Sequence, residues 1–424
     1  MSRTVLAGLL VCTLCLMAAA RPGGGTGAGR GTPPAPAGSG TGLRTDSNLT
    51  TFKSRFYEVS TDMPRAEVNP IVAHMDAVYQ EYLRRFDGFA VKNAIAVRMY
   101  LFRTREAYTK FLDSKGVPNA NSGGIFFIID NNESGLCTFI EGQPGRRMYH
   151  VLQHEGFHQF AHIRLGETLP IWANEGLAEY FGRGILVKGV MRTGVAPQSR
   201  IDELVSAVRG KRAFDFVTLL GMDSEQWSKI VTSGDKRAAL MYDQSWSIVH
   251  FLVQGDKGKY ADAFVKYLKL IAQGRNHAQA SDAAFGVGSL PAFEKSWRRF
   301  ILEDVQPDAI STAVDRLDFF GEGIKFLASK GAKPASFEEL KEKLTKMGFV
   351  LTRIEEGAKT VWAANDDGIF DPPPRDDASR PTKYEWIAAK GEGLPGIRVK
   401  GLSVGVVLGW TKTASGYDSK VDFE

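Results

Sequence analysis

The sequence predicts an α+β protein in which an N-terminal mixed sheet is followed by a mostly helical half and by a smaller C-terminal α+β domain. Two observations indicate this. Apolar residues alternate with a period of two in several segments of residues 51–142, whereas apolar spacings of three and four prevail from residue 147 onwards. A second region with its own helices and short strands begins near residue 310. A chain of 424 residues with 43% hydrophobic and 24% charged side chains can bury more than one core.

The first 43 residues differ in composition from the rest. Residues 1–20 combine Arg3, the apolar run VLAGLLVCTLCLM and a final AAA, which is typical of a secretory signal peptide cut after Ala20. Residues 21–43 are almost entirely Gly, Pro, Ala, Thr and Ser, a composition typical of a flexible linker. We therefore expect an extracytoplasmic protein (secreted, periplasmic or in the cell envelope) with no stable membrane span after cleavage. An uncleaved anchor or a lipoprotein is the alternative, and the oligomeric state stays open.

Residues 44–308 are expected to form one domain, with a sheet first and helices after it. The predicted strands are 51–59, 93–102, 123–130 and 135–142, and helices are predicted between them at about 64–86 and 104–116. Later helices are predicted at 147–165, 174–183, 200–209, 236–254, 258–273 and 289–304.

Residues 309–424 are expected to form an accessory domain of unknown role. Helices are predicted at 312–330 and 336–346, and short strands and loops follow as far as GLSVGVVLGW, residues 401–410.

Four of the seven histidines lie at intervals of four residues, and the inner pair belongs to an H-E-x-x-H motif. Residues four apart share a helix face, so His154 and His158 can reach one metal ion. Glu155 is rotated by about 100° from His154, which places its carboxylate beside the ion, where a general base belongs. Successive steps of four drift by about 40°, so His150 and His162 are interpreted as polar residues on the helix surface.

A catalytic zinc site needs three protein ligands and one open position, so a third ligand is required. The segment LPIWANEGLAEYF supplies Glu175 near the start of the next predicted helix, which Asn174 could cap. Glu179 lies one turn later on the same face, where it could accept the free ring N–H of a ligating histidine. Two imidazoles and one carboxylate suit Zn²⁺, which is therefore the expected cofactor.

H-E-x-x-H followed by N-E-G-x-A-x-Y resembles the gluzincin zinc metallopeptidases, which include thermolysin and the zinc aminopeptidases. It is most similar to the peptidase-MA-like domains of exported bacterial proteins. The resemblance covers about residues 50–305 and implies a gluzincin-like catalytic domain. It implies that His154, His158 and Glu175 bind zinc and that Glu155 is the general base. It also implies that Glu179 orients the first histidine.

The resemblance extends to two further segments. ALMYDQSWSIVHFL places Tyr242 where the zinc aminopeptidases have a tyrosine that steadies the oxyanion, although Ser245 replaces the glycine of that motif. The predicted strand GGIFFIID, residues 123–130, matches the edge strand along which such enzymes bind an extended substrate. The exopeptidase motif of the aminopeptidases is absent from this strand, which argues against amino-terminal trimming. The choice between endo- and exo-action stays open.

Together these residues predict an exported zinc-dependent hydrolase that cleaves peptide bonds in a peptide or protein substrate. The net charge of +5 is spread without a dense basic cluster, which gives no support to nucleic-acid binding. The alternative is an exported binding or envelope-scaffold protein whose zinc site is structural or catalytically silent. A metal hydrolase acting on a non-peptide amide is a third possibility.

Overall fold

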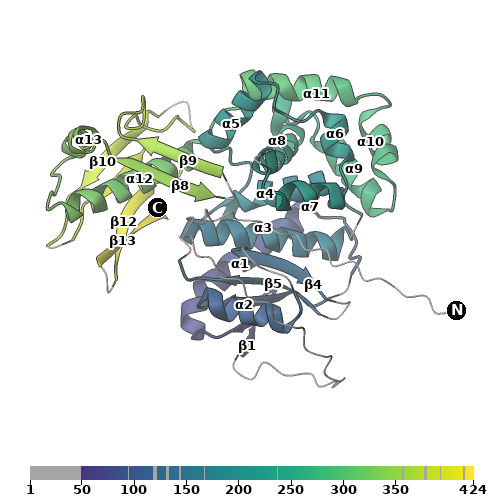
Figure 1. The fold of residues 1–424 in the computed structure, drawn as a ribbon, viewed down its shortest axis with the longest axis horizontal. Helices are drawn as coiled ribbons and strands as arrows, with labels where there is room; N and C mark the ends of the chain where they lie inside the picture. Colours follow the sequence, from purple (N-terminus) through teal and green to yellow (C-terminus); the bar gives the residue numbers. More distant parts are fainter. Residues whose placement is uncertain are drawn as a thin grey trace, which may run out of the picture.

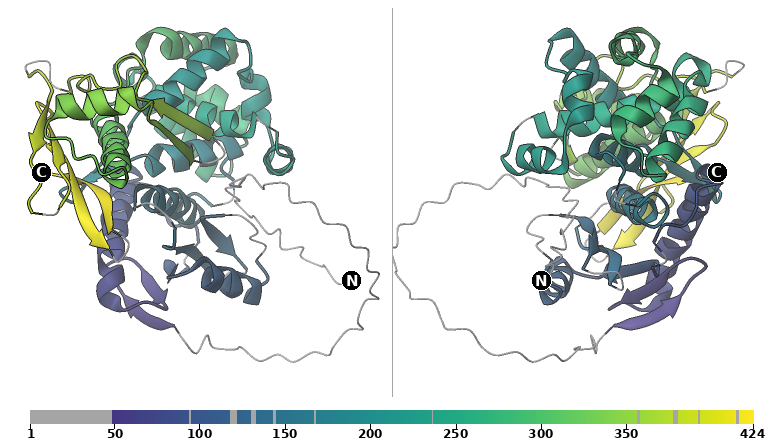
Figure 2. Two further views of the ribbon diagram at one scale, coloured as in Figure 1. Left: turned by 60° about the vertical axis from the view of Figure 1, so that its left-hand side comes forward. Right: turned by 90° about the vertical axis from the view of Figure 1, so that its right-hand side faces the viewer.

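The protein is seen here in a computed structural model that describes residues 49–424 apart from 94, 118–121, 130–132, 143–144, 167, 236, 356–357, 377–379, 392 and 414–415. The expected signal peptide and linker lie outside the described residues. Helices and strands are both abundant, which confirms the α+β class. A sheet with its helices occupies one part of the molecule, a helical half lies against it, and the C-terminal domain lies to one side of both (Figures 1 and 2).

The N-terminal part is a five-stranded sheet in the order β1-β2-β3-β5-β4. Its strands are β1 (Thr50–Lys53), β2 (Glu58–Thr61), β3 (Arg98–Phe102), β4 (Gly124–Ile128) and β5 (Ser134–Phe139). The central pairs β2–β3 and β3–β5 are parallel, and the outer pairs are antiparallel. Of the segment GGIFFIID, Gly124–Ile128 form the strand β4, which lies at an edge of this sheet.

The single strand predicted at 51–59 is wrong, because the chain turns between β1 and β2. The carboxylate of Asp76 accepts hydrogen bonds from the Ser54 hydroxyl and from the backbone N–H groups of Arg55 and Phe56. Three donors on one distant carboxylate stabilise the turn, and this partner is not visible in the local alternation of the strand.

Three helices cover the two faces of the sheet. They are α1 (Arg65–Arg85), α2 (Arg105–Ser114) and α3 (Gly145–Arg164). Residues of α1 and α3 share one hydrophobic cluster with one face of the sheet, and α2 forms a separate cluster with the other face. Gly156 lies where α3 approaches α1, since a Cβ there would lie 2.9 Å from the Met75 methyl group. This contact accounts for a residue that costs about 1 kcal/mol in a helix.

The helical half follows, together with a small hairpin of β6 (Ile185–Val187) and β7 (Val190–Arg192). Its helices are α4 (Ile171–Gly182), α5 (Gln198–Arg209), α6 (Phe216–Gly221), α7 (Ser224–Thr232), α8 (Arg237–Gly258), α9 (Ala261–Ala272), α10 (His277–Phe285), α11 (Leu290–Arg299) and η1 (Phe300–Asp304), a π-helical turn. Short helices α6, α7 and α10 were not predicted. The expectation that Asn174 caps α4 is wrong, because α4 begins at Ile171 after Pro170 and Asn174 lies inside it.

The C-terminal domain has its own hydrophobic cluster, which begins at Ala309, whereas the larger cluster ends at Val305. Its elements are α12 (Ala309–Ser329), α13 (Phe337–Lys346), the hairpin of β8 (Val350–Glu355) and β9 (Ala358–Ala363), and the sheet of β10 (Lys383–Ile387), β11 (Gly396–Lys400), β12 (Val406–Thr413) and β13 (Gly416–Phe423). The four strands of the sheet pair antiparallel in the order β10-β11-β12-β13.

Polar contacts connect this domain to the rest of the protein. Arg146, at the start of α3, donates to Asp315 at 2.8 Å and to Asp318 at 3.3 Å. The Asp308 N–H donates to the Ala196 carbonyl, and Ile185 packs against the C-terminal cluster. The C-terminal domain is therefore in direct contact with the hairpin β6–β7 and with the first turn of α3.

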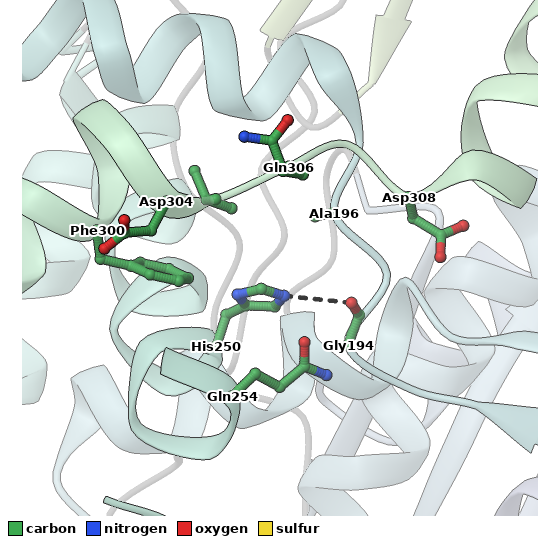
Figure 3. Close-up of a pocket in the computed structure, with 9 residues that line it drawn as sticks. Gly194, Ala196, His250, Gln254, Phe300, Asp304, Gln306 and Asp308 are labelled. Carbon is green, nitrogen blue, oxygen red and sulfur yellow. Dashed lines mark hydrogen bonds between the residues drawn. The ribbon is translucent and has the colours of Figure 1, made fainter. Parts of the chain in front are cut away.

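A cavity of about 290 Å³ lies beside residues 304–308, the segment that leads into α12 (Figure 3). It is lined by Gly194, by His250 and Gln254 of α8, and by Phe300, Asp304 and Asp308. The Nε2 atom of His250 lies 3.2 Å from the Gly194 carbonyl oxygen. Residues of the metal cluster described below do not line this cavity.

Within the part of the chain that the structure describes, no helix combines the length and the apolar character needed to cross a membrane.

Candidate metal site

The candidate site lies where α3 and α4 pack together. The side-chain amide of Gln153 on α3 is hydrogen-bonded to the end of α4. The Gln153 side-chain N–H group donates to the carbonyl oxygens of Phe181 and Gly182 at 3.0 and 2.9 Å. The Gln153 side-chain oxygen lies 2.7 Å from His74 Nε2, and its backbone carbonyl accepts from the Tyr82 hydroxyl. Sequence reasoning missed Gln153, because a glutamine before H-E-x-x-H carries no signal of its own. Its contacts hold α3, which carries the histidines, against the C-terminal end of α4.

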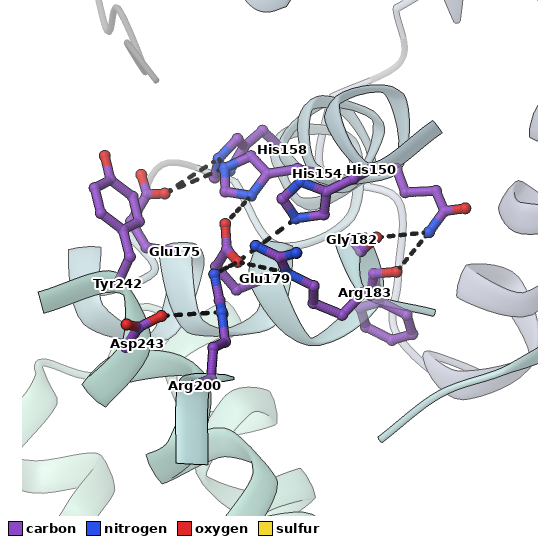
Figure 4. A network of polar contacts seen from close by, with 12 residues as sticks. His150, His154, His158, Glu175, Glu179, Gly182, Arg183, Arg200, Tyr242 and Asp243 are labelled. Atoms are coloured by element: carbon purple, nitrogen blue, oxygen red, sulfur yellow. Dashed lines mark hydrogen bonds and ion pairs between the residues drawn. The ribbon is translucent and has the colours of Figure 1, made fainter. Parts of the chain in front are cut away.

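Three donor atoms converge between these helices (Figure 4). His154 Nε2 and His158 Nε2 lie 3.0 Å apart. One oxygen of Glu175 lies 3.4 Å from His154 Nε2 and 3.5 Å from His158 Nε2. The three side chains are buried, with at most 3% of each residue exposed. The structure thus brings together the three residues expected to be ligands.

These distances fit a small tetrahedral ion. Ligand atoms about 2.0 to 2.1 Å from a tetrahedral ion lie about 3.3 to 3.4 Å from one another, close to the separations observed here. Burial disfavours the ionised form of Glu175, but His158 and His154 hold its pKa well below its usual range. One buried carboxylate oxygen and two imidazole nitrogens together form a suitable donor set for a divalent cation.

Glu155 lies next to the donor atoms and is fully buried. One carboxylate oxygen accepts a hydrogen bond of 2.8 Å from the Phe126 backbone N–H of the edge strand β4. The other oxygen has no hydrogen-bond partner among the described residues. Burial raises the pKa of Glu155 to about 7, although His154, His158 and the Phe126 N–H lower it. A carboxylate with a pKa in this range can both accept and release a proton near neutral pH.

Glu179 contacts the far side of the first histidine. Its Oε1 atom lies 2.9 Å from His154 Nδ1. A carboxylate in this position favours a proton on Nδ1, which leaves the Nε2 lone pair for an ion. Burial disfavours its ionised form, but Arg200 and then His150 hold the pKa of Glu179 well below its usual range. Arg200 of α5 contacts the other oxygen, Oε2. Sequence reasoning missed Arg200. Its place in the first turn of a predicted helix was the available signal, since a cation there opposes the helix dipole unless it is paired.

His150 does not lie on the helix surface, and that interpretation is wrong. It is 9% exposed, and its Nε2 atom lies 3.6 Å from Glu179 Oε2. His150, His154 and Glu179 therefore form a second buried group that could hold a metal ion, beside the group of His154, His158 and Glu175. His162 is half-buried and lies near Asn93, outside both groups.

Helix α8 packs against the opposite side of α4, and a glycine permits the contact. A Cβ on Gly176, next to Glu175, would lie 2.5 Å from the Ser245 carbonyl oxygen. Tyr242, one turn earlier on α8, is partly buried, and its hydroxyl accepts a hydrogen bond of 3.4 Å from the Trp227 indole N–H. Figure 4 draws Tyr242 on the Glu175 side of the cluster. Trp172, Tyr180 and Phe181, on the same helix as Glu175, are buried and belong to the hydrophobic core.

A protein-family model described as "Protein of unknown function (DUF1570)" matches residues 150–275. The matched segment contains the H-E-x-x-H motif, Glu175, Glu179 and Tyr242. A search of curated proteins found no match for this chain. The match thus includes the candidate metal site, and its description names no activity.

Proposed function

We propose that this chain is an exported zinc metallopeptidase with a gluzincin-like catalytic domain. The observation that carries the proposal is the convergence of His154, His158 and Glu175 on one point, with the Glu155 carboxylate beside them. The chemistry supplied by zinc in such a site is activation of a water nucleophile and polarisation of the scissile carbonyl.

The residues of the chain have distinct parts in this reaction. Glu155 accepts the proton of the attacking water and later delivers it to the leaving amine. The Phe126 N–H holds one oxygen of Glu155, which leaves the other oxygen for the proton. Glu179 fixes the tautomer of His154, and Tyr242 is the candidate donor to the oxyanion.

A structural zinc site is the alternative, and complete burial of the ligands is consistent with it. Structural sites, however, close the coordination with four protein ligands. In each of the two groups three residues offer donor atoms, and in the second group the Arg200 guanidinium already contacts the carboxylate of Glu179. A buried Glu155 without a partner for one oxygen also has no evident use in a purely structural site.

The test compares residues 21–424 with the Glu155→Gln variant on a complex peptide library, with cuts mapped by mass spectrometry. We expect cuts from the unaltered protein, and zinc content equal in both proteins. The variant should lose turnover by about 10²- to 10⁴-fold, the usual contribution of a general base. His158→Ala should lose the metal, and Glu225→Gln on the exposed first turn of α7 is the matched control that should keep both.

Cuts by Glu155→Gln at the rate of the unaltered protein would contradict the role of Glu155. Absence of cuts from a folded, zinc-loaded protein would contradict peptidase activity and favour the scaffold alternative or a non-peptide amide as substrate. Cut positions from the active protein distinguish endo- from exo-action.

A further inference from the structure

Arg200 is a buried cation that contacts none of the expected metal ligands directly. Glu179 lies between it and the ligand His154. Arg200 is 6% exposed. Its Nη2 atom donates to Glu179 Oε2, and its Nε atom lies 2.9 Å from Asp243 Oδ1 on α8. Figure 4 shows the resulting row of contacts from Asp243 through Arg200 and Glu179 to His154. Four helices, α8, α5, α4 and α3, each contribute one of these side chains.

The arginine divides the two oxygens of Glu179 between different partners. Oε2 contacts the guanidinium group, and Oε1 lies 2.9 Å from His154 Nδ1. Asp243 fixes the guanidinium in turn, so the orientation of the Glu179 carboxylate does not depend on α4 alone. A carboxylate held in this way keeps its histidine in one tautomer and one ring orientation.

The second group of possible metal ligands, His150, His154 and Glu179, shares Glu179 with Arg200. His150 Nε2 and Arg183 Nε also lie near Glu179 Oε2, at 3.6 and 3.8 Å. An ion bound by His150, His154 Nδ1 and Glu179 would lie beside the carboxylate whose Oε2 atom the Arg200 guanidinium contacts. Two positive charges about 4 Å apart repel each other strongly in a buried, low-dielectric site. Arg200 thus disfavours an ion on the Nδ1 side of His154.

We propose that Arg200 is a positioning residue of the metal centre: it holds Glu179 on His154 Nδ1 and so directs the ion to His154 Nε2, His158 and Glu175. The inference deepens the proposed metal site and does not depend on peptide cleavage, because its readouts are metal affinity and coordination.

The experiment measures zinc affinity by competition with a chromophoric chelator, and the visible absorption of the Co²⁺-substituted protein. Arg200→Gln removes the charge and is expected to weaken zinc binding by about 10- to 100-fold, as the loss of outer-shell partners does elsewhere. It should also alter the Co²⁺ spectrum. Arg200→Lys retains the charge and should recover part of the affinity. Arg298→Gln, which removes an Arg–Glu ion pair of α11 in the same helical half, is the matched control and should bind zinc like the unaltered protein.

A second substitution tests where the ion goes. His150→Ala should weaken zinc binding less than Arg200→Gln does, since His150 is not among the expected ligands and its Nε2 atom lies 3.6 Å from Glu179 Oε2. In the Arg200→Gln background the same change should weaken binding further, because the ion then gains access to His150. Non-additive effects of this kind report a coupling between the two sites.

Unchanged affinity and an unchanged Co²⁺ spectrum in a folded Arg200→Gln protein would overturn the proposal. If circular dichroism shows that Arg200→Gln does not fold, Asp243→Asn replaces it, because this variant keeps the arginine but weakens its hold. An affinity within twofold of the unaltered protein together with an unchanged Co²⁺ spectrum in Asp243→Asn would likewise overturn the proposal. If the metal site itself is wrong, the unaltered protein and His158→Ala should bind the same amount of zinc. This outcome is distinct from failure of the role proposed for Arg200.

Discussion

At the residue scale, His250 shows how burial alone changes the chemistry of an imidazole. Its ring is packed among Trp246, Tyr180 and Phe300, and 5% of the residue is exposed. Burial lowers the pKa of His250 to about 4, although the contact with the Gly194 carbonyl raises it. The carboxylates of Asp304 and Asp308 line the same cavity, but they do not offset this cost. His250 is therefore neutral in the folded protein at any pH near 7.

This shift predicts a loss of stability in mild acid. Since the folded pKa lies below the unfolded value of about 6.5, the unfolded chain binds more protons between these two values. His250 does not affect the free energy of unfolding above pH 6.5. Below that pH the free energy of unfolding falls, and the total loss reaches about 3 kcal/mol once the pH is below 4. Urea unfolding of the metal-free protein should show this loss, and His250→Phe should be less sensitive by about 2 kcal/mol between pH 7 and pH 4.5. Parallel pH dependences of the two proteins would contradict a buried neutral His250.

At the element scale, α4 is held between α3 and α8, and its glycines set the distances. Gly176 allows the backbone of α8 to approach, and a Cβ on Gly182 would lie 2.9 Å from the His150 ring. The ligand Glu175 adjoins the first of these glycines. The position of a metal ligand therefore depends on helix packing that the ligand does not itself make.

We expect Gly176→Ala to destabilise the protein by about 1 to 3 kcal/mol, because the new methyl group would overlap the Ser245 backbone and force α4 and α8 apart. Zinc affinity should fall with it, since Glu175 moves with its neighbour. Gly221→Ala, at the end of α6 with no atom within 4 Å of the new Cβ, is the control and should change stability by less than about 0.5 kcal/mol. Urea unfolding and zinc titration measure both effects. Equal stability of the two variants would show that the α4–α8 contact tolerates a methyl group.

Elements differ in how far local sequence predicts them. Helix α3 and the strands β3, β4 and β5 follow from strong apolar periodicity within each segment. Helices α6, α7 and α10 span six to nine residues, too few for a periodic pattern to stand out from chance. The turn between β1 and β2 depends on Asp76, which lies about twenty residues further along the chain. Short elements and turns of this kind are determined by partners that the local segment does not contain.

At the scale of the whole molecule, the described residues bury two large hydrophobic clusters. The first ends at Val305 and the second begins at Ala309. The candidate metal ligands belong to the region of the first cluster. The connections to the C-terminal domain include ion pairs of Arg146 with Asp315 and Asp318, and these side chains are between 25% and 47% exposed. Exposed pairs of this kind contribute roughly 0 to 1 kcal/mol each, which couples the two units weakly.

We therefore expect two thermal transitions in scanning calorimetry, and we expect zinc to shift only one of them. A ligand stabilises the unit that binds it, by about 4 kcal/mol when its free concentration is 1,000 times the dissociation constant. The transition of residues 49–308 should move upwards with zinc, and that of residues 309–424 should stay in place. His158→Ala is the control in which neither transition should respond. A single transition that moves as a whole would contradict weak coupling between the units.

The sequence by itself determined the relations that lie within one helix. A separation of four residues places His154 and His158 on one face of α3, and adjacency places Glu155 beside them, because helix geometry depends on local backbone angles alone. Tertiary structure decided which residues meet across helices. It buried His150 against Glu179 and brought Arg200 to the same carboxylate. Such contacts depend on how side chains of separate helices interlock, and no spacing within a single segment specifies them.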